Sequence, residues 1–529
     1  MAAHPGEGDQ NGRGTDDRAK AWFNSPLSVL RRPFSLFHLP LPFSERRLLL
    51  TGLDLLAVNG ALLLILALRS DQGLVWQLFI RHPLRFLLLN VLWLPIAHAF
   101  DAYDLRVSSR FSTAAPAVTR AGLLTGVLYC LLNPALMPAL PNRFLSILAL
   151  PFLSTAFLMA GRGLYVLSLF QPLFHRRALI VGAGWAGRTI AQVLTEHGGG
   201  MYWLVGFVDD DPVKQGAAVD AGGGSEGVGR VQAGGGEAGD ALGVHTVGAL
   251  ASLHVIGDRH ALKSLIAEQR VTTLVLAITH EVNGELLQIL MDCLELGVEI
   301  IAMPVLYEQL TGRVPVEHVG GNWYVAMPVH HPGTGTMWPV IKRLTDVVLA
   351  SLGLLLLGMA TPVIAAAIYL DSPGPIFYTQ ERVGKGGCRF QAYKFRSMVT
   401  DAEEGEAIWA RKDDQRVTRV GRFLRKTHVD EFPQFLNILR GEMSAVGPRP
   451  ERPEFVEELA QDIPFFRVRH AARPGMAGWA LVNQGYGSSR EAAVIKLQYD
   501  LYYIKHQSLW LDLVILLKTV VDSFALRGR

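Results

Sequence analysis

The stretch VVLASLGLLLLGMATPVIAAAIYL, from Val347 to Leu370, decides how this chain is organised. It contains no charged residue, and it is longer than the roughly 20 apolar residues that a helix needs to cross the hydrocarbon of a bilayer. Lys342, Arg343 and Asp346 precede the run, and a region rich in charged residues follows it. The juxtaposition indicates polar chemistry at a bilayer surface, on a substrate that is partly lipid.

The middle of the apolar run favours a helix that turns back rather than one that crosses. Thr361-Pro362 lies in mid-run, where proline removes a backbone donor and kinks or breaks a helix. A single crossing would also place everything after Asp371 on the side of the membrane that lacks nucleotide substrates and magnesium. We therefore predict a re-entrant helix over residues 342–370, with its break at Thr361 and Pro362. A spanning helix is the alternative.

Four further apolar segments precede this run, each near the length of a membrane-spanning helix. They are approximately Leu48 to Leu68, Phe86 to Phe100, Ala114 to Leu136 and Phe144 to Leu169. Arginines on both flanks favour cytoplasmic ends and an even number of crossings: Arg31, Arg32, Arg46 and Arg47 before the first segment, Arg176 and Arg177 after the fourth. We predict a transmembrane region over 46–170, preceded by a disordered cytoplasmic tail over 1–45. Four buried helices of a soluble domain are the alternative.

The composition also indicates a mixture of membrane and soluble parts. Half of the 529 residues are hydrophobic, 18% are charged, and the mean hydropathy is +0.25. These values are too apolar for a typical soluble enzyme and too polar for a transporter. A net charge of +3 without a recognisable nucleic-acid module argues against a nucleic-acid partner. The three cysteines lack metal-ligand spacing, which argues against a zinc site.

From Arg177 the pattern changes to alternating strands and helices. Ala178 to Val181 is a short apolar strand, and the sequence GAGWAG follows it with the G-x-G-x-x-G spacing at Gly182, Gly184 and Gly187. A second strand, Val205 to Val208, ends at Asp209, at the spacing of an acid that binds a ribose. We predict a Rossmann-like, doubly wound parallel sheet over 171–315, with a flexible Gly-rich insertion at 213–247 and a linker at 316–340.

The glycine fingerprint has two interpretations. It is compatible with NAD(P) or another nucleotide bound at Gly182, Gly184, Gly187 and Asp209. The alternative is that the glycines only permit a tight turn and close helix packing in a domain that serves assembly or regulation. A sugar dehydratase or epimerase would also need Tyr-x-x-x-Lys, and none of the 13 tyrosines has a lysine four residues later.

An acidic pair marks the candidate catalytic site. The stretch HVDEFPQFLNILRGEMSAVGPRP, from His428 to Pro450, contains Asp430 and Glu431 just before Pro433. The fixed φ of Pro433 suits the first turn of a helix, and Gly441 fits the residue that ends it. The amino end of a helix favours an ionised carboxylate and a bound phosphate. An N-capping aspartate with surface salt bridges is the alternative.

This pair suits phosphoryl chemistry. An ionised Asp430 can act as a nucleophile toward phosphorus, provided that cations neutralise the phosphates. Glu431 is the natural ligand for Mg²⁺. Four basic residues are candidate phosphate contacts: Lys394, Arg396, Arg425 and Arg449.

The motifs together resemble one enzyme family. They are KRLTD, DSPGPIFYTQERVG, YKFRSM, RFLRKTHVDEFPQFLNILRGEMSAVGPRPE and RPGMAGWALVNQ, and all lie between residues 341 and 529. This region is similar to the bacterial sugar transferases, in particular the large monotopic phosphoglycosyl transferases, or polyprenyl glycosylphosphotransferases, of exopolysaccharide biosynthesis. That branch includes undecaprenyl-phosphate glucose and galactose phosphotransferases. The family usually has Ser-Pro at the helix break, where this chain has Thr361-Pro362.

The resemblance implies a function in two steps. Asp430 would attack the β-phosphate of a UDP-sugar, release UMP and carry the phosphosugar, and undecaprenyl phosphate would then accept it. Glu431 would hold Mg²⁺. The product would start exopolysaccharide, O-antigen or capsule repeat units at the bacterial inner membrane, with the soluble domains in the cytoplasm. Partners would be the UDP-sugar, undecaprenyl phosphate and the bilayer, and a homo-oligomer stays open.

Two other functions stay open from the sequence. One is a membrane-anchored, NAD-dependent nucleotide-sugar dehydratase or epimerase that works through the Gly182 fingerprint. The other is a non-catalytic scaffold that senses a nucleotide. The overall fold that we predict is a membrane α plus α/β protein: four transmembrane helices, a Rossmann-like domain, and an α-rich catalytic domain over 341–529 with a re-entrant helix.

Overall fold

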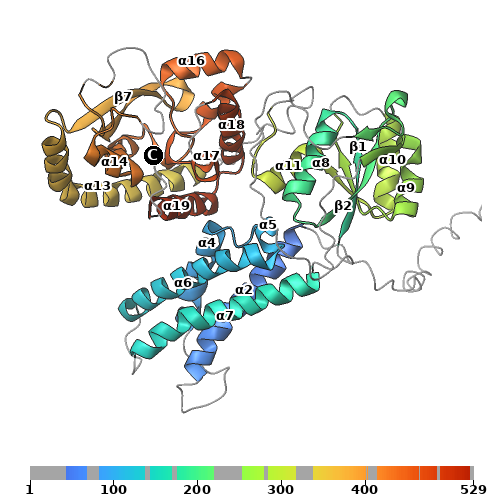
Figure 1. Cartoon of the computed structure of the whole chain (residues 1–529), viewed down its shortest axis with the longest axis horizontal. Helices are drawn as coiled ribbons and strands as arrows, with labels where there is room; N and C mark the ends of the chain where they lie inside the picture. The colour runs from blue at the N-terminus through green and yellow to red at the C-terminus, as the bar shows by residue number, and fades with distance from the viewer. Residues whose placement is uncertain are drawn as a thin grey trace, which may run out of the picture.

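The computed structural model describes eleven segments of the chain: residues 43–67, 83–136, 143–169, 175–219, 253–278, 284–316, 337–400, 402, 414–463, 465–484 and 489–524. Within them the chain forms a bundle of apolar helices, an α/β unit and a C-terminal domain, which meet near the centre of the molecule (Figure 1). The predicted tail up to residue 42, most of the predicted insertion and most of the predicted linker lie outside the described residues.

Each of the four predicted N-terminal segments is a helix. They are α2 (Phe43–Ala67), α4 (Pro83–Ala99), α6 (Phe111–Leu136) and α7 (Arg143–Leu169), and the short α5 (Leu105–Ser108) follows α4. By length and composition α2, α6 and α7 can cross a membrane, whereas α4 is a shorter apolar helix of 17 residues. The structure therefore agrees with a membrane bundle at this end of the chain.

Small residues and a buried ion pair hold the bundle together. A side chain at Gly126 would come within 2.7 Å of Pro151, so this glycine allows α6 and α7 to approach closely. Arg162 on α7 donates to Asp54 on α2 at 2.7 Å, and both side chains are buried. A charged pair inside an apolar bundle is tolerated because each charge has its partner within reach.

The α/β unit contains a mixed sheet in the strand order β3-β4-β2-β1-β5-β6. The strands are β1 (Arg176–Val181), β2 (Tyr202–Val208), β3 (Ala218–Val219), β4 (Leu253–Gly257), β5 (Thr273–Leu276) and β6 (Glu299–Ala302). Five strands are parallel, and the edge strand β3 pairs with β4 in the antiparallel direction. The sheet is thus not wholly parallel, because β3 lies in the Gly-rich segment that carries no strand signal in the sequence.

Helices cover both faces of this sheet (Figure 1). The helices are α8 (Trp185–His197), α9 (Leu262–Gln269), α10 (Gly284–Glu295) and α11 (Met303–Thr311), with the short turns η3 (Pro212–Lys214) and η4 (Arg259–Ala261). Apolar side chains of α8 and α11 form one core with the sheet, and those of α9 and α10 form another. Because both faces are covered, the central strands read as continuous apolar runs in the sequence.

The C-terminal domain begins with one long helix and continues as a hairpin and short helices. Its elements are α13 (Met337–Asp371), β7 (Phe377–Val383), η6 (Lys385–Gly387), β8 (Arg389–Phe395), α14 (Arg419–Lys426), η7 (Val429–Gln434), α15 (Phe435–Arg440), β9 (Ser444–Val446), α16 (Pro453–Asp462), η8 (Phe466–Ala471), β10 (Gly475–Ala477), α17 (Trp479–Gln484), α18 (Arg490–Lys505) and α19 (Leu509–Phe524). β7 and β8 pair antiparallel, and β9 pairs with β10 in parallel.

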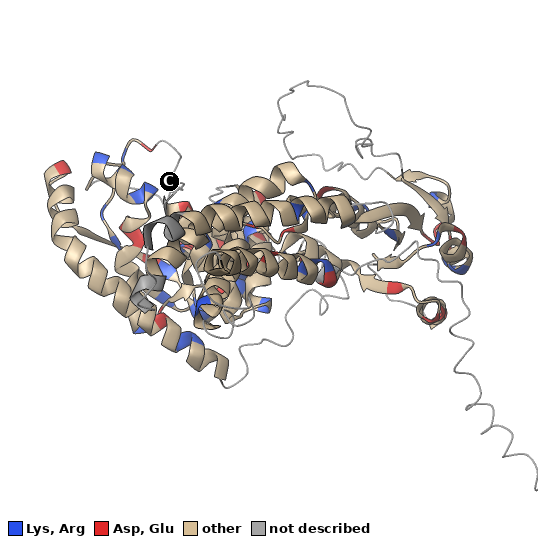
Figure 2. Ribbon diagram, turned by 90° about the horizontal axis from the view of Figure 1, so that it is seen from below, with Lys and Arg blue, Asp and Glu red and all other residues tan. Residues whose placement is uncertain are grey.

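Helix α13 is 35 residues long and stays helical through Pro362. The Thr361 hydroxyl donates to the Leu357 carbonyl at 2.7 Å, one turn earlier, as expected for a threonine beside a helix proline. Figures 1 and 2 show the helix bending along one side of the domain. Figure 2 also shows charged residues near its two ends and few between them.

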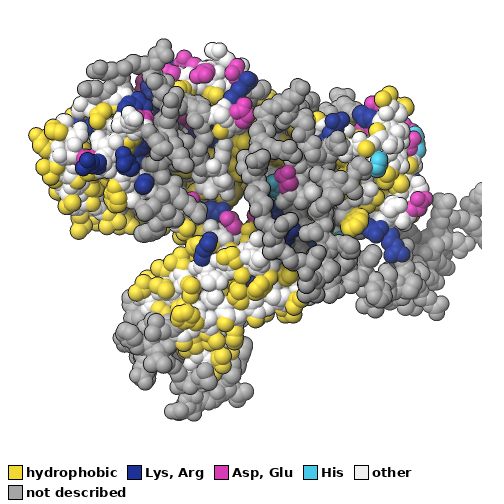
Figure 3. Space-filling model, in the orientation of Figure 1, with side chains coloured by type: hydrophobic (Ala, Val, Ile, Leu, Met, Phe, Trp, Pro, Cys, Tyr) yellow, Lys and Arg dark blue, Asp and Glu magenta, His cyan; other side chains and the backbone are white. Residues whose placement is uncertain are grey.

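Both ends of α13 are bonded to the same domain. At its start, Arg343 donates to the Ile438 and Leu439 carbonyls at 2.6 and 2.7 Å. At its end, the Asp371 carboxylate accepts from the Val420 amide at 2.8 Å. Between these points most large apolar side chains of α13 are exposed, and they form part of the hydrophobic surface at the left edge of Figure 3.

The three parts of the molecule meet around α18 and α19. Glu308 of α11 is buried and pairs with Lys505 at 2.8 Å. Lys518 of α19 pairs with Asp101, in the turn after α4, at 2.7 Å. The C-terminal domain is thus bonded both to the α/β unit and to the bundle, on the side of the bundle where α4 ends.

Candidate active site

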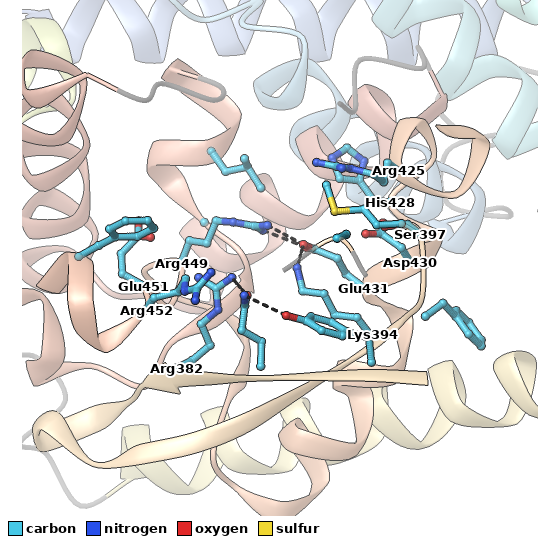
Figure 4. Close-up of a pocket in the computed structure, with 18 of the residues that line it drawn as sticks. Arg382, Lys394, Ser397, Arg425, His428, Asp430, Glu431, Arg449, Glu451 and Arg452 are labelled. Carbon is cyan, nitrogen blue, oxygen red and sulfur yellow. Dashed lines mark hydrogen bonds and ion pairs between the residues drawn. The ribbon is translucent and has the colours of Figure 1, made fainter. Parts of the chain in front are cut away.

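A cavity of about 560 Å³ lies in the C-terminal domain, between the β7–β8 hairpin, η7 and the helices α16 to α18. Figure 4 shows its side chains converging from these elements. All six candidate catalytic and phosphate-binding residues from the sequence line it: Lys394, Arg396, Arg425, Asp430, Glu431 and Arg449. The structure therefore brings the predicted site residues together in one cavity.

The basic residues of the hairpin are positioned by strand geometry and by a buried asparagine. Lys394 and Arg396 are two residues apart at the end of β8, so both face the cavity. Asn437, on α15, accepts from the Tyr393 amide at 3.1 Å and donates to the Gln391 carbonyl at 2.7 Å. It is fully buried and couples the acidic segment to β8. Sequence reasoning gave Asn437 no role, because a lone asparagine carries no pattern.

The acidic pair lies in a 3-10 turn rather than in the first turn of an α-helix. His428 precedes the turn with φ of 59°, η7 follows, and α15 continues to Arg440. Gly441 ends α15 with φ of 81°, as predicted for the terminating glycine. Asp430 and Glu431 are both buried. A surface N-cap, the alternative interpretation of the pair, does not match this geometry.

Glu431 is held by two cations. Lys394 Nζ donates to Oε1 at 2.8 Å, and Arg449 donates from Nη2 to Oε1 at 2.5 Å and from Nη1 to Oε2 at 2.9 Å. Burial alone would raise the pKa of Glu431, but the Arg449 guanidinium and the Lys394 ammonium hold that pKa well below its usual range. Glu431 is therefore an ionised carboxylate with a fixed orientation.

Asp430 differs from Glu431 both in its hydrogen bonds and in the direction of its pKa shift. Within the described part of the chain, no group donates a hydrogen bond to its carboxylate. Burial, followed by repulsion from Glu431, raises the pKa of Asp430 to about 6, although Lys394, Arg425 and Arg449 act against that rise. A carboxylate with a raised pKa and no hydrogen-bond partner is a stronger base and nucleophile than an ordinary aspartate.

A second group of charges supports the cavity and was missed from the sequence. Glu451 lines the cavity and pairs with Lys496, and Arg469 lies 3.7 Å from the same carboxylate. Arg469 also pairs with the buried Asp500 at 2.7 Å and donates to the Arg449 carbonyl at 2.9 Å. In the sequence, the charged residues of QERVG and GPRPE were the only indication of this group. The residues that pair with Glu451 lie far along the chain, so their proximity could not be read from the sequence.

A magnesium ion fits Glu431 as one ligand. Oε2 accepts a single hydrogen bond, from Arg449, so it retains capacity for a further contact. Among the described residues, no group of three or more His, Cys, Asp or Glu side chains is placed to hold a metal. Mg²⁺ commonly binds through one or two carboxylates plus substrate phosphates and water, which is the arrangement that this donor set permits.

The glycine fingerprint of the α/β unit is also brought together, at the turn between β1 and α8. Gly182 has φ of +106°, and a side chain there would come within 2.8 Å of the Ala277 carbonyl. Asp209 accepts from the Ala183 amide at 2.7 Å, and Lys214 Nζ lies 3.2 Å from the same carboxylate. A side chain at Gly187 would come within 2.0 Å of the Gly182 carbonyl, whereas one at Gly184 would meet nothing. These contacts give the turn a structural role without a ligand.

Comparison with known proteins points to the C-terminal domain. A family model described as bacterial sugar transferase matches residues 337–525. A UDP-N-acetylgalactosamine-undecaprenyl-phosphate N-acetylgalactosaminephosphotransferase from Aeromonas hydrophila is 40% identical over 240 residues, which are 45% of this chain and 56% of that protein. A UDP-glucose:undecaprenyl-phosphate glucose-1-phosphate transferase from Escherichia coli (strain K12) is 41% identical over 205 residues, 38% of this chain and 44% of that protein.

A shorter relative is covered almost completely. The exopolysaccharide production protein PSS from Rhizobium leguminosarum bv. phaseoli is 39% identical over 199 residues, which are 36% of this chain and 98% of that protein. The chain thus spans about half the length of the first two relatives and nearly all of the third.

Proposed function

Since this chain belongs to the bacterial sugar transferase family, we propose that it transfers a sugar 1-phosphate from a UDP-sugar to undecaprenyl phosphate and releases UMP. The reaction would start the assembly of an exopolysaccharide, O-antigen or capsule repeat unit. The observation that carries the proposal is the contrast between two adjacent buried carboxylates, Glu431 held by Lys394 and Arg449, and Asp430 without a hydrogen-bond partner.

In the first step, a carboxylate oxygen of Asp430 attacks the β-phosphorus of the UDP-sugar. A bond forms between that oxygen and phosphorus, and the bond from the β-phosphorus to the bridging oxygen breaks, so that UMP leaves with the bridging oxygen. Lys394 and Arg449 lie beside Asp430 and stabilise the negative charge of the phosphates. The product is a phosphosugar bonded to Asp430.

In the second step, an oxygen of undecaprenyl phosphate attacks the same phosphorus. The bond between phosphorus and Asp430 breaks, the carboxylate is regenerated, and undecaprenyl diphosphosugar is released. Glu431 would hold Mg²⁺, which would neutralise part of the negative charge of the donor phosphates. Two successive displacements need no outside co-reactant.

We also propose that α13 is re-entrant and that both soluble parts are on the cytoplasmic side of the inner membrane. The support is that Arg343 and Asp371, at opposite ends of the helix, are bonded to one compact domain. A domain cannot be on both sides of a bilayer, so a helix with both ends on it must return. The ion pair between Lys518 and Asp101 supports placing the turn after α4 on that same side.

The α/β unit is, in this proposal, a Rossmann-like domain that serves docking rather than redox chemistry. The strand order β4-β2-β1-β5-β6 with helices on both faces supports a Rossmann-like fold. A docking role is supported by the ion pair of Glu308 with Lys505 and by the contacts of Asp209 with the turn and with Lys214. No observation favours the dehydratase or the sensing scaffold over the transferase.

The proposal is tested by supplying purified protein with Mg²⁺, undecaprenyl phosphate and a panel of UDP-sugars. Release of UMP that depends on both the donor and the lipid phosphate supports the transferase. Conversion of a UDP-sugar that requires NAD and proceeds without lipid would support a dehydratase or epimerase instead. Because glucose and N-acetylgalactosamine occur in the names of relatives, UDP-glucose and UDP-N-acetylgalactosamine head the panel.

A further inference from the structure

Three charged side chains at the start of α13 all bond to one stretch of chain, residues 438–446. They are the charged residues of the KRLTD motif, Lys342, Arg343 and Asp346. The groups that they contact are the Ile438 and Leu439 carbonyls, the Ser444 hydroxyl, the Ala445 amide and the Val446 carbonyl. This stretch lies in the chain between Glu431 and Arg449, so the start of the apolar helix holds the segment that connects these two residues.

Lys342 belongs to a buried cluster of polar groups. Its Nζ donates to the Val446 carbonyl at 3.0 Å, to the Tyr503 hydroxyl at 3.1 Å and to Asp512 Oδ2 at 2.5 Å. The Tyr503 hydroxyl donates to Asp512 Oδ1 at 2.8 Å and lies 3.1 Å from the same Val446 carbonyl. Tyr503 and Asp512 are 1% and 5% exposed. Helices α13, α18 and α19 thus meet at one backbone oxygen of β9.

Stability alone is a weak reason for such a cluster. A buried ion pair contributes little net stability, because the cost of removing two charges from water offsets their attraction. What the pair does supply is a fixed geometry, since Lys342 has its three contacts in three directions. The consequence of the cluster is therefore expected in the position of Val446 and of the residues that follow it.

The chain between Val446 and Arg449 has no room to adjust. A side chain at Gly447 would come within 2.3 Å of the Arg473 carbonyl, and one at Gly475 would come within 2.0 Å of the Gly447 amide nitrogen. The two backbones are therefore in direct contact at this point. Close-packed groups transmit a displacement instead of absorbing it, so a shift of Val446 is passed on to Arg449.

Arg449 is sensitive to such a shift. Its guanidinium bonds both oxygens of Glu431, and this forked contact needs the two planar groups to face each other (Figure 4). Its own carbonyl accepts from Arg469 at 2.9 Å. The backbone is thus fixed on both sides of the side chain, at Val446 by the cluster and at Arg449 by Arg469.

We propose that Lys342, Tyr503 and Asp512 are positioning residues that orient Arg449 toward Glu431 through the Val446 carbonyl. The inference rests on the proposed transferase function. Among the described residues that line the cavity, the three do not occur, so their effect on the reaction is carried by the backbone. The start of the membrane helix is thereby part of the catalytic geometry as well as an anchor.

The test measures the first half-reaction in two variants of the full-length protein, purified in detergent. UDP-glucose and UDP-N-acetylgalactosamine are the donor probes, and the one that gives a UMP burst with the wild type is kept. Tyr503→Phe removes one hydroxyl and leaves both buried charges in place, and the rate constant of the burst should fall about 3- to 10-fold. Lys342→Met removes all three contacts of Nζ and should lower the rate constant roughly 10- to 100-fold.

Burst amplitude separates positioning from folding. Loss of folded protein lowers the amplitude, whereas a misplaced Arg449 lowers the rate constant at unchanged amplitude and at a donor KM within about threefold of the wild type. Tyr499→Phe, one turn earlier on α18, is the matched control. Tyr499 is also buried, and Arg313 Cζ lies 4.7 Å from its ring centre, a contact that phenylalanine keeps. Its rate constant should stay within about twofold of the wild type.

A double-mutant cycle decides whether the cluster acts through Arg449. In an Arg449→Gln protein there is no guanidinium to orient, so adding Tyr503→Phe or Lys342→Met should change the rate constant less than about twofold. Effects that persist in full in this background overturn the proposal, as do wild-type rate constants in both single variants. A wild type that releases no UMP with either donor and Mg²⁺ refutes the proposed function itself.

Discussion

Arg449 donates two hydrogen bonds to Glu431, from Nη1 to Oε2 at 2.9 Å and from Nη2 to Oε1 at 2.5 Å. The planar fork of a guanidinium matches the two oxygens of a carboxylate, which an ammonium cannot do. Since Lys394 already supplies an ammonium to Oε1, the guanidinium adds orientation as well as charge. The neighbouring Asp430 is left free by this arrangement.

Two substitutions of Arg449 distinguish the effect of its positive charge from the effect of its forked contact with Glu431. Arg449→Lys keeps the charge but loses the fork, and we expect it to slow UMP release roughly 10- to 100-fold. Arg449→Gln removes the charge as well and should slow it further, because the pKa of Glu431 would no longer be held as low. The rate of UMP release at saturating UDP-sugar measures both variants. Equal activity of Arg449→Lys and the wild type would show that the forked contact has no catalytic consequence.

Neutralising Asp430 should stabilise the fold while it abolishes the reaction. A raised carboxyl pKa means that the folded protein holds the proton more tightly than the unfolded chain does, so the ionised form destabilises the fold above that pKa. Removing the charge as Asp430→Asn should therefore raise the melting temperature at pH 8, by an amount equivalent to at most about 3 kcal/mol.

The gain should shrink to a small fraction near pH 4, because Asp430 is then protonated in the folded protein and partly protonated in the unfolded chain, where the carboxyl pKa is about 3.9. Asp462→Asn, at a side chain that is 55% exposed, is the control and should change little at either pH. A melting temperature for Asp430→Asn that falls at pH 8 would mean that Asp430 is a structural partner rather than a strained nucleophile.

The pH dependence of the first half-reaction follows from the same pKa. The nucleophile must be ionised, and with a pKa of about 6 the single-turnover rate of UMP release should fall tenfold for each pH unit well below 6. An aspartate with an ordinary pKa would keep its rate down to about pH 4. The rate is measured from pH 5 to 8 after confirming that incubation at pH 5 is reversible. A flat profile down to pH 5 contradicts the raised pKa.

Topology can be tested with a native residue. Cys388 lies exposed in the connection between β7 and β8, whereas Cys293 is buried. If α13 returns to the cytoplasm, a membrane-impermeant maleimide should label Cys388 only after spheroplasts are permeabilised. Cys388→Ser provides the background signal. Labelling of Cys388 in intact spheroplasts would place the C-terminal domain outside and rule out the re-entrant helix.

The sequence was most informative where a pattern is local. The apolar runs predicted the positions of α2, α4, α6 and α7, because length and the absence of charge are readable without partners. The stretch from His428 to Pro450 likewise showed the acidic pair and the residue that ends α15, Gly441. The mixed sheet was not predicted, since β3 is two residues long and its partner strand lies beyond the Gly-rich segment.

What the sequence left out depends on contacts between distant positions. Asn437 couples α15 to β8, and Asp500 pairs with Arg469 across 31 residues, so neither side chain is distinctive until the fold is known. The unequal environment of the acidic pair is of the same kind. Asp430 and Glu431 are neighbours in sequence, yet only the fold gives one of them two cationic partners.

The most direct test of the account is to trap the intermediate and locate it. Wild-type protein is mixed with Mg²⁺ and the accepted UDP-sugar in the absence of lipid phosphate, quenched, digested and analysed by mass spectrometry. The account predicts a phosphosugar on the peptide that contains Asp430, which disappears when undecaprenyl phosphate is added before the quench. A phosphosugar on any other residue, or an adduct of equal yield in Asp430→Asn, would contradict it.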